Sequence, residues 1–229
     1  MKKTLLLSCL GLLLLVLLYT FKSFTLPIFT DNGIASLRTI EVNKDQQNLL
    51  IRGHDRNLPI LLFLHGGPGM PAMFMAHDFQ RELEKHFVVV HWDQRGAGKS
   101  YREDISAEEL SISALLSDTD KVVDYLRELL QQDKVWLVGH SHGSYLGILY
   151  ASENPEKVTA FVGTGQVTHF EREVEVQDAY LQTQLAKLGW SSETEINSSN
   201  REELLFQTGS EIYGETSFMP LILQRLKSY

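Results

Sequence analysis

The sequence predicts an α/β protein with a mostly parallel sheet, and three observations carry that prediction. Short, continuously apolar runs recur along the chain, and segments with helical periodicity lie between them. Strands that are covered by helices on both faces are apolar throughout, so such runs are typical of βαβ units. Glycine-rich turns follow two of the runs, where a strand of this kind gives way to a helix.

The strands are expected in a definite order along the chain. Ile34–Val42 and Asn48–Arg52 predict an antiparallel entry around a polar turn at Asn43–Gln47. The buried strands expected after them are Pro59–Leu64, Phe87–Val90, Val135–Val138 and Val158–Val162.

Helices are expected between these strands, over residues 73–86 and over Tyr145–Ser152. Two capping-box spacings, Ser106 with Glu109 and Thr168 with Glu171, predict the starts of two further helices. In the first of these, apolar residues at helical spacing predict a stripe that faces the core: Ile112, Leu115, Thr119, Val122, Leu126 and Leu129.

Composition excludes several classes of protein. With 43% hydrophobic and 22% charged residues, the chain of 229 residues is globular and not disordered. A formal charge of −8 excludes a typical nucleic-acid-binding protein. The single cysteine, Cys9, leaves the globular part without a disulfide or a cysteine zinc site. No metal-binding, P-loop or dinucleotide pattern is present, so no cofactor is predicted.

The N-terminus begins with an apolar segment. Thr4–Phe21 holds eighteen residues without a charge, a helix of about 27 Å, which is enough to cross a hydrocarbon layer. The run is longer than the apolar part of a usual signal peptide, which predicts a membrane anchor. Lys2 and Lys3 outweigh Lys22 in positive charge, so the following domain is expected outside the cytoplasm. A cleaved signal peptide with a secreted or periplasmic product is the alternative. The predicted division is therefore an anchor over 1–25, a core over 26–167 and a helical lid region over 168–229.

The pattern Gly139-His140-Ser141-His142-Gly143 follows a buried strand and precedes a helix. A serine at such a strand-to-helix turn presents its hydroxyl at the carboxyl edge of the sheet, and the start of the helix directs N–H groups there. Ser141 is therefore the candidate nucleophile. A glycine-rich turn with an incidental serine is the structural alternative.

A second glycine-rich loop, His65–Gly69, follows the strand Pro59–Leu64. Glycines let a backbone approach a reacting carbonyl closely, and N–H donors there would stabilise a developing oxyanion. Both loops leave the same edge of a parallel sheet, so we expect them to lie together.

These two loops and the segment Trp92–Ser100 resemble the proline iminopeptidase group of α/β-hydrolases over roughly residues 34–168. The resemblance implies the α/β-hydrolase fold and a serine peptidase that releases N-terminal residues from short peptides. It also implies Ser141 as the nucleophile and the backbone N–H groups of Gly67 and His142 as the oxyanion hole. The membrane and a small peptide or ester are the partners expected; no oligomeric state is predicted.

The triad acid and base are not identifiable in the sequence. His169 and Asp178 follow Ser141, but in the order opposite to that of the fold. The final strands that carry acid and base in the family are expected to be missing, since only 88 residues follow Ser141 and they have the pattern of a lid. The acidic residues there, Glu171, Glu173 and Glu175, are expected to form a solvated helix face.

Three functions remain open. The first is an aminopeptidase-like serine hydrolase in an inactive, C-terminally truncated form. The second is an esterase or lipase of the same fold, and the third is a binding protein with a hydrolase-like body that performs no catalysis.

Overall fold

The computed structural model describes residues 11, 25–187, 189 and 196. Apart from Gly11 and Thr25, the predicted anchor lies outside these residues, as does most of the predicted lid region after residue 187. Within the described part of the chain, no helix is both long and apolar enough to cross a bilayer. The chain divides into two compact units, Met1–Val167 and Thr168–Tyr229.

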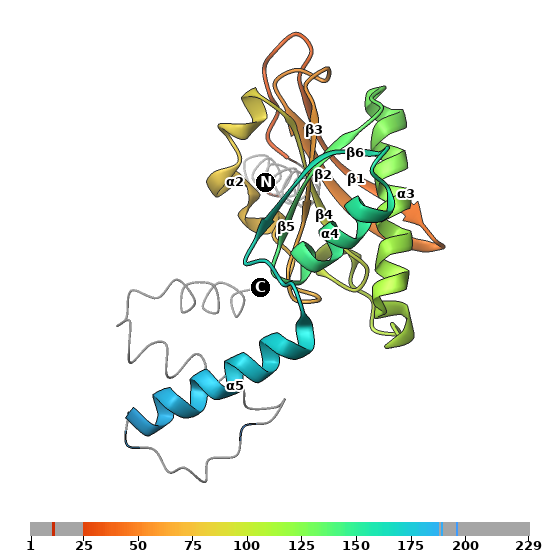
Figure 1. The fold of residues 1–229 in the computed structure, drawn as a ribbon. Helices are drawn as coiled ribbons and strands as arrows, with labels where there is room; N and C mark the ends of the chain where they lie inside the picture. Colours follow the sequence, from red (N-terminus) through yellow and green to blue (C-terminus); the bar gives the residue numbers. More distant parts are fainter. Residues whose placement is uncertain (1–10, 12–24, 188, 190–195, 197–229) are drawn as a thin grey trace, which may run out of the picture. The chain divides into compact units, whose positions relative to one another are not determined.

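The first unit contains one six-stranded sheet in the order β1-β2-β4-β3-β5-β6 (Figure 1). The β1–β2 and β2–β4 pairings are antiparallel, and β4, β3, β5 and β6 run parallel to one another. The strands are β1 (Ile34–Val42), β2 (Asp45–Gly53), β3 (Ile60–Leu64), β4 (Val88–Asp93), β5 (Val135–His140) and β6 (Val158–Thr164). The predicted α/β class with a mostly parallel sheet is confirmed, and β6 is the last strand among the described residues.

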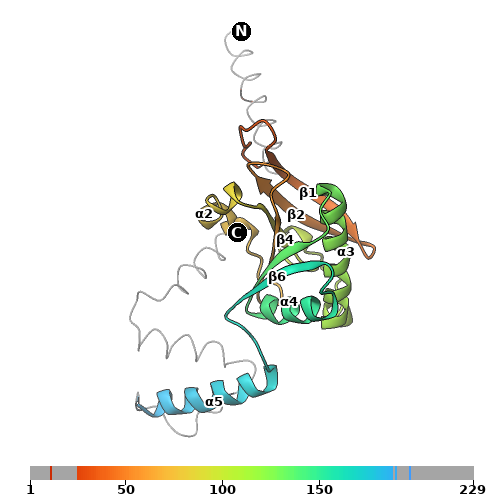
Figure 2. The ribbon, with the colours of Figure 1, turned by 45° about the horizontal axis from the view of Figure 1, so that its top comes forward.

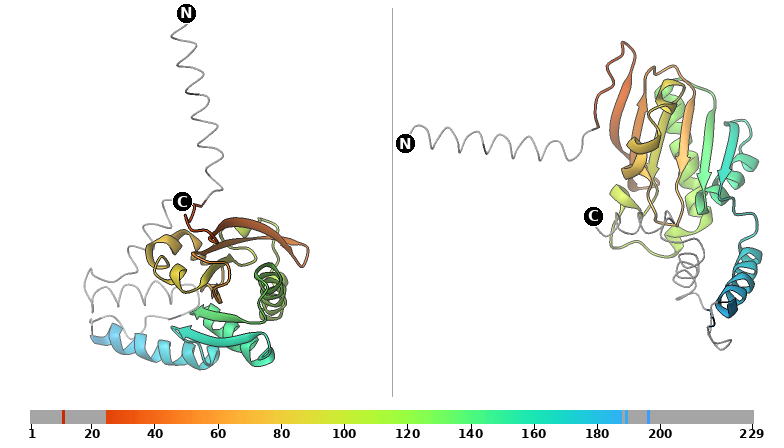
Figure 3. Two further views of the ribbon diagram at one scale, coloured as in Figure 1. Left: turned by 90° about the horizontal axis from the view of Figure 1, so that it is seen from above. Right: turned by 90° about the vertical axis from the view of Figure 1, so that its left-hand side faces the viewer.

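Helices cover both faces of the sheet. The helices α3 (Ile112–Leu130) and α4 (His142–Glu153) lie on one face, and α2 (Ala76–Phe79) lies on the other (Figure 2). The right-hand view of Figure 3 looks at the sheet from the side of α2, which is coloured yellow. The remaining helical elements of this unit are the short 3-10 turns η1 (Met73–Met75), η2 (Leu83–Lys85), η3 (Gly98–Ser100) and η4 (Glu108–Leu110).

The main core lies between the sheet and the α3–α4 face. Leu49 and Ile51 of β2 belong to this core, whereas Leu50 between them packs with Met73 and Ala76 on the opposite face. This alternation follows from the two-residue repeat of a strand. The predicted stripe of α3 is buried at Leu115, Thr119, Val122 and Leu126, and its ends, Ile112 and Leu129, are half-buried.

The predicted turn at Asn43–Gln47 is wrong in length. Asn43 and Lys44 alone form the turn, with φ angles of 49° and 67°, and β2 already begins at Asp45. Two residues with positive φ make a hairpin turn whose twist matches that of the strands. Asp45 and Gln47 are polar but buried, because Asp45 pairs with Arg102 and Gln47 bonds to Asp118 and Trp92, all from distant segments of the chain.

The single helix predicted over 73–86 is also wrong, since this segment forms η1, α2 and η2. Glu84 explains the interruption after α2. Its carboxylate forms an ion pair with Arg52 of β2 at 2.7 Å, and its carbonyl accepts the N–H of His54 at 2.8 Å. These tertiary bonds override the helical tendency of the segment.

The capping box predicted at Ser106 and Glu109 is present, but it closes the 3-10 turn η4 and not the long helix. The side chain of Ser111 caps α3 by accepting the N–H of Ala114. In the second unit, α5 (Phe170–Lys187) follows the predicted helical pattern, and it buries Leu181 and Leu185 in a small cluster.

Candidate active site

Ser141 is the only residue between β5, which ends at His140, and α4, which begins at His142. Its φ of 52° and ψ of −121° are a combination that residues with side chains rarely adopt. Its N–H donates to the carbonyl of Thr164 on β6 at 2.9 Å, which fixes the turn to the neighbouring strand. The strained turn leaves the serine half-exposed at the carboxyl edge of the sheet.

The two glycines of the motif are required by close packing. A Cβ on Gly139 would collide with the backbone carbonyl of Gly143. A Cβ on Gly143 would collide with the carbonyl oxygens of Leu64 and His65 at the end of β3. Helix α4 therefore starts in direct contact with the backbone of the sheet, and this contact brings the turn against the glycine-rich loop.

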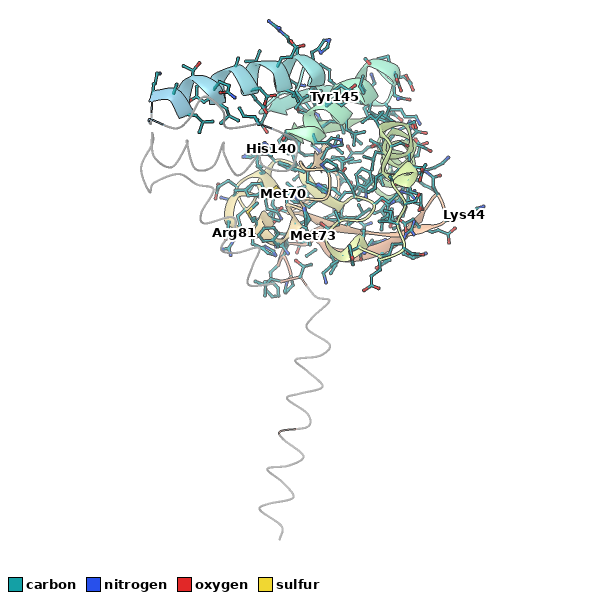
Figure 4. All side chains as sticks on the ribbon, turned by 90° about the horizontal axis from the view of Figure 1, so that it is seen from below. Lys44, Met70, Met73, Arg81, His140 and Tyr145 are labelled. Atoms are coloured by element: carbon teal, nitrogen blue, oxygen red, sulfur yellow. The ribbon has the colours of Figure 1, made fainter. Side chains whose placement is uncertain are left out.

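The loop His65–Gly69 lies beside Ser141, as the sequence predicts. A Cβ on Gly66 would lie 3.1 Å from the Cβ of Ser141 and 3.1 Å from the carbonyl oxygen of His140. The N–H of Met70 donates to the carbonyl of Gly66 at 3.2 Å and closes the loop. Met70 directly after this loop and His140 at the end of β5 accordingly lie near one another (Figure 4).

Two backbone N–H groups in this region, those of Gly67 and His142, do not donate the hydrogen bonds of a helix or a sheet. Gly67 has a φ of 114°, and its N–H donates no hydrogen bond to any other described residue. His142 is the first residue of α4, where N–H groups lack an intrahelical acceptor and the helix dipole is positive. Both groups are thus available to an anionic oxygen near Ser141.

His65 is held as a neutral imidazole that links two loops. Its Nδ1 lies 2.9 Å from the carbonyl oxygen of Gly66, and its Nε2 accepts the N–H of Gln94 at 3.1 Å. Only the tautomer with a proton on Nδ1 satisfies both bonds. Burial lowers the pKa of His65 to about 4, although its bond to Gly66 opposes this shift. With both nitrogens occupied, His65 positions the glycine-rich loop and is no base.

The other histidines near Ser141 do not bond to its hydroxyl either. His140 is exposed, and its Nδ1 lies 3.2 Å from the hydroxyl of Thr164. The Nδ1 of His142 is buried without a partner in the described part of the chain, and burial lowers the pKa of this imidazole.

Three further histidines have structural surroundings. His91 is buried with its ring stacked on that of Phe63 at 4.7 Å, and burial lowers its pKa to about 3. His86 is exposed beside η2. His169 is exposed, and its Nδ1 accepts the N–H of Arg172 at the start of α5. Among the described residues, neither a histidine nor a carboxylate forms a hydrogen bond with the hydroxyl of Ser141.

The acidic residues at the start of α5 are described only in part. Glu175 is exposed and forms an ion pair with Arg172 at 2.7 Å, as on a solvated helix face. The side chains of Glu171 and Glu173 lie outside the described part of the structure.

Two residues to which the sequence assigns no role, Ser144 and Gln166, hold the site together. The hydroxyl of Ser144 donates to the carbonyl of Ser141 at 2.6 Å and accepts the N–H of Val167 at 3.0 Å. The amide of Gln166 donates to the carbonyl of Ser144 at 3.3 Å. These bonds tie the segment after β6 to the serine turn. A serine three residues after the turn is a signal of local backbone bonding, but its distant partners are not visible in the sequence.

The loop after β4 is held by a buried ionic network. Both carboxylate oxygens of Asp118 on α3 accept hydrogen bonds from Arg95, at 2.7 and 2.8 Å. Gln47 and Asn43 also donate to this carboxylate, each at 2.7 Å. Gln47 in turn accepts the indole N–H of Trp92 at 2.8 Å. The network therefore joins the β1–β2 hairpin, α3 and the loop that carries Gln94.

Asp93, at the end of β4, is a buried carboxyl with a single strong partner. One oxygen accepts the N–H of Lys99 at 2.8 Å, and the other has no partner among the described residues. Burial raises the pKa of Asp93 to about 6, although the bond from Lys99 opposes this shift. At neutral pH this carboxyl is therefore a buried charge that opposes folding.

We expect Asp93→Asn to stabilise the protein at about pH 8 by about 2 kcal/mol, and hardly at all at about pH 4. Because the pKa is raised in the folded state, the contribution of Asp93 to stability is full below about pH 4 and is lost as the pH rises through about 6. Asparagine resembles the protonated form at every pH. Urea unfolding followed by tryptophan fluorescence measures the effect, with the exposed Asp31→Asn as control. An equal gain at both pH values would contradict this assignment.

Comparison with known proteins agrees with this geometry. Residues 59–188 match the family model described as the alpha/beta hydrolase fold. A probable aminopeptidase of Bacillus subtilis is 39% identical over 137 residues, which are 60% of this chain and 43% of that protein. A proline iminopeptidase of Neisseria meningitidis is 39% identical over 114 residues, which are 49% of this chain and 34% of that protein. The chain thus spans less than half the length of these curated relatives.

Solved structures agree on the fold. A proline iminopeptidase-related protein of Thermus thermophilus superposes with a TM-score of 0.58 and 23% identity, over 75% of this chain and 56% of that one. A proline iminopeptidase of Mycobacterium smegmatis gives a TM-score of 0.54 and 20% identity, over 81% and 58% of the two chains. The family match covers more than half of the chain, and it spans the strand, the glycine-rich loop and the serine turn described above. The chain therefore belongs to the α/β-hydrolase fold family.

Proposed function

We propose that Ser141 is the nucleophile of a serine hydrolase site and that the N–H groups of Gly67 and His142 form its oxyanion hole. The observation that carries this proposal is the strained backbone of Ser141 with Gly66 directly beside it. Such a turn holds the hydroxyl away from the sheet and close to N–H donors. Each donor in an oxyanion hole contributes roughly 3–4 kcal/mol to the lowering of the barrier.

In this mechanism the oxygen of Ser141 attacks a substrate carbonyl, and its proton passes to a general base. The carbonyl oxygen becomes negative and accepts hydrogen bonds from Gly67 and His142. The tetrahedral intermediate then expels the leaving amine, which takes the proton from the base and leaves an acyl group on Ser141. Water attacks this acyl-enzyme with the help of the same base and releases the acid.

The substrate class we propose is a short peptide from which the N-terminal residue is released. The support is the set of relatives named aminopeptidase or proline iminopeptidase, which are 39% identical over 137 and 114 residues. A simple ester as substrate, acted on by an esterase of the same fold, is the competing assignment.

We propose further that this chain, as it stands, has negligible turnover. Serine is a weak nucleophile without a histidine to accept its proton. Among the described residues, no histidine is bonded to Ser141, and His65 uses both nitrogens elsewhere. Substantial aminopeptidase activity of the unmodified chain that disappears in Ser141→Ala would contradict this part of the proposal.

Added imidazole can take the place of a general base, and this property provides a test of Ser141 as the nucleophile. We expect imidazole to accelerate the hydrolysis of p-nitrophenyl acetate by the full chain, with Ser141→Ala at the background rate. Prolinamide is expected to compete, and N-acetylprolinamide is not, because an aminopeptidase site requires a free amino group. No difference between the wild type and Ser141→Ala would contradict the nucleophile assignment. Equal competition by the two amides would favour the esterase.

For the location, we propose an N-terminal membrane anchor with the domain outside the cytoplasm. The support is the uncharged run Thr4–Phe21 and the two lysines that precede it.

A further inference from the structure

The chain enters the folded body through a buried clamp. The guanidinium of Arg52 forms an ion pair with Glu84 at 2.7 Å, and it donates to the hydroxyl of Thr25 at 2.6 Å and the carbonyl of Leu26 at 2.5 Å. Arg52, Glu84 and Thr25 are all buried. The backbone at residues 25 and 26 is therefore fixed to β2 and η2.

A second set of bonds fixes the same segment at Thr30 and Asn32. The hydroxyl of Thr30 donates to the carbonyl of His54 at 2.6 Å. Asn32 donates from its side chain to Asp55 at 2.6 Å, and its carbonyl accepts the N–H of Arg56 at 2.9 Å. The residues between the two attachments are thus held in one place on the body.

These residues, Leu26–Phe29, present an apolar strip to the outside. Phe29 is 92% exposed and Leu26 is 63% exposed, and Pro27 between them is also exposed. Full burial of one such side chain is worth about 1.5–3 kcal/mol. Two large apolar side chains that are exposed to water within one fixed segment of four residues indicate a surface that is covered in use.

The sequence indicates what covers the strip. Only three residues separate the uncharged run Thr4–Phe21 from Thr25. The four residue steps from Phe21 to Thr25 span at most about 14 Å, so a domain fixed at Thr25 must lie close to a bilayer that Phe21 enters. The strip then lies at the depth of the lipid headgroups, where aromatic side chains are favoured.

We propose that the strip Leu26–Phe29 docks on the lipid surface and fixes the orientation of the domain. This inference rests on the proposed membrane anchor. Arg52 pairs with Val89 near the start of β4, so the strip lies at the amino edge of the parallel strands. Ser141 follows the carboxyl end of β5, at the opposite edge. Docking through the strip therefore turns the candidate site away from the lipid, toward water-soluble substrates.

The test uses the full chain in vesicles of phosphatidylcholine and phosphatidylglycerol, with a fluorophore on a single cysteine. The native Cys9 reports on insertion of the anchor. With Cys9→Ser, a label at Asp31→Cys reports on the strip, and a label at Lys44→Cys serves as control. Lys44 lies in the hairpin turn at the far end of β1 (Figure 4), about 30 Å from Gly33 at roughly 3.4 Å per residue.

We expect headgroup-level spin-labelled lipid to quench the label at residue 31 and not the label at residue 44. The double change Leu26→Ser and Phe29→Ser is expected to remove most of the quenching at residue 31. Tyr101→Ser, which removes a comparably exposed aromatic ring elsewhere, is expected to leave it unchanged. Quenching of the label at Cys9 without quenching of the label at residue 31 would overturn the docking of the strip but not the insertion of the anchor. No quenching at Cys9 would overturn both, and equal quenching at residues 31 and 44 would overturn the orientation.

Discussion

Gly143→Ala is expected to destabilise the protein by about 3 kcal/mol or more. The new Cβ would overlap the carbonyl oxygens of Leu64 and His65, which are backbone atoms at the end of β3 and have no rotamer to change. Relief requires α4 to move away from the sheet, which disrupts the serine turn and the core beneath it. Urea unfolding followed by tryptophan fluorescence measures the loss.

Gly69→Ala is the matched control, because this glycine has a φ of 84° and a Cβ there would meet no atom within 4 Å. It adds backbone strain alone, for which we expect about 1 kcal/mol. Equal losses for the two substitutions would show that the close approach of α4 to β3 is not the reason for a glycine at 143.

Asp118→Asn is expected to cost about 3–5 kcal/mol, because it leaves the buried guanidinium of Arg95 without its main counter-charge. Asp118 has no exposed surface, and its two oxygens accept four hydrogen bonds. Hydrogen bonding to Asp118 raises the pKa of Arg95. A guanidinium keeps its proton at neutral pH even without such a partner, so Arg95 stays charged in the variant. Urea unfolding is again the measurement.

Asp104→Asn is the control for this change, since Asp104 pairs with Arg102 at 3.0 Å on an exposed surface. Exposed pairs contribute about 0–1 kcal/mol. The double change Arg95→Met and Asp118→Leu is expected to be less harmful than Asp118→Asn, because it removes both buried charges together. A double variant less stable than the single one would contradict this explanation.

The parts of the fold that could be predicted from the sequence are those that depend on local patterns. Val135–Val138 and Pro59–Leu64 are apolar runs followed by glycine-containing turns, and each marks a parallel strand to within two residues at either end. The strand-to-helix turn at Ser141 and the adjacent glycine-rich loop also follow, because loops at the carboxyl ends of parallel strands meet at one edge.

The parts that could not be predicted depend on partners far apart in the chain. Asp45 and Gln47 look like turn residues, yet they belong to a strand. Arg102 pairs with Asp45, and Asp118 and Trp92 bond to Gln47, inside the protein. Glu84 looks like a surface residue of a helix, yet Arg52 draws it into the interior. From the sequence, a polar residue is assigned to a loop because it is polar. Only the assembled fold shows that partners inside the protein satisfy its hydrogen bonds.

The candidate site shows the same division. The motifs identify Ser141, Gly67 and His142 as candidates, but nothing local indicates that His65 bridges to Gln94 or that Ser144 bridges to Val167. These bridges join loops that follow different strands. The bond from Gln94 shows that His65 has a structural role. From the sequence alone, that role can be inferred only from the place of His65 in the chain.

The most direct test of Ser141 as a nucleophile is covalent modification of the full chain by a fluorophosphonate in the presence of imidazole, mapped by peptide mass spectrometry. We expect Ser141 to be modified at a rate that increases with the imidazole concentration, and Ser141→Ala to take up no phosphonate at this turn. We also expect exposed serines such as Ser113 on α3 to remain unmodified. Modification spread evenly over exposed serines, or a folded protein whose Ser141 stays unmodified at every imidazole concentration, would contradict the nucleophile assignment.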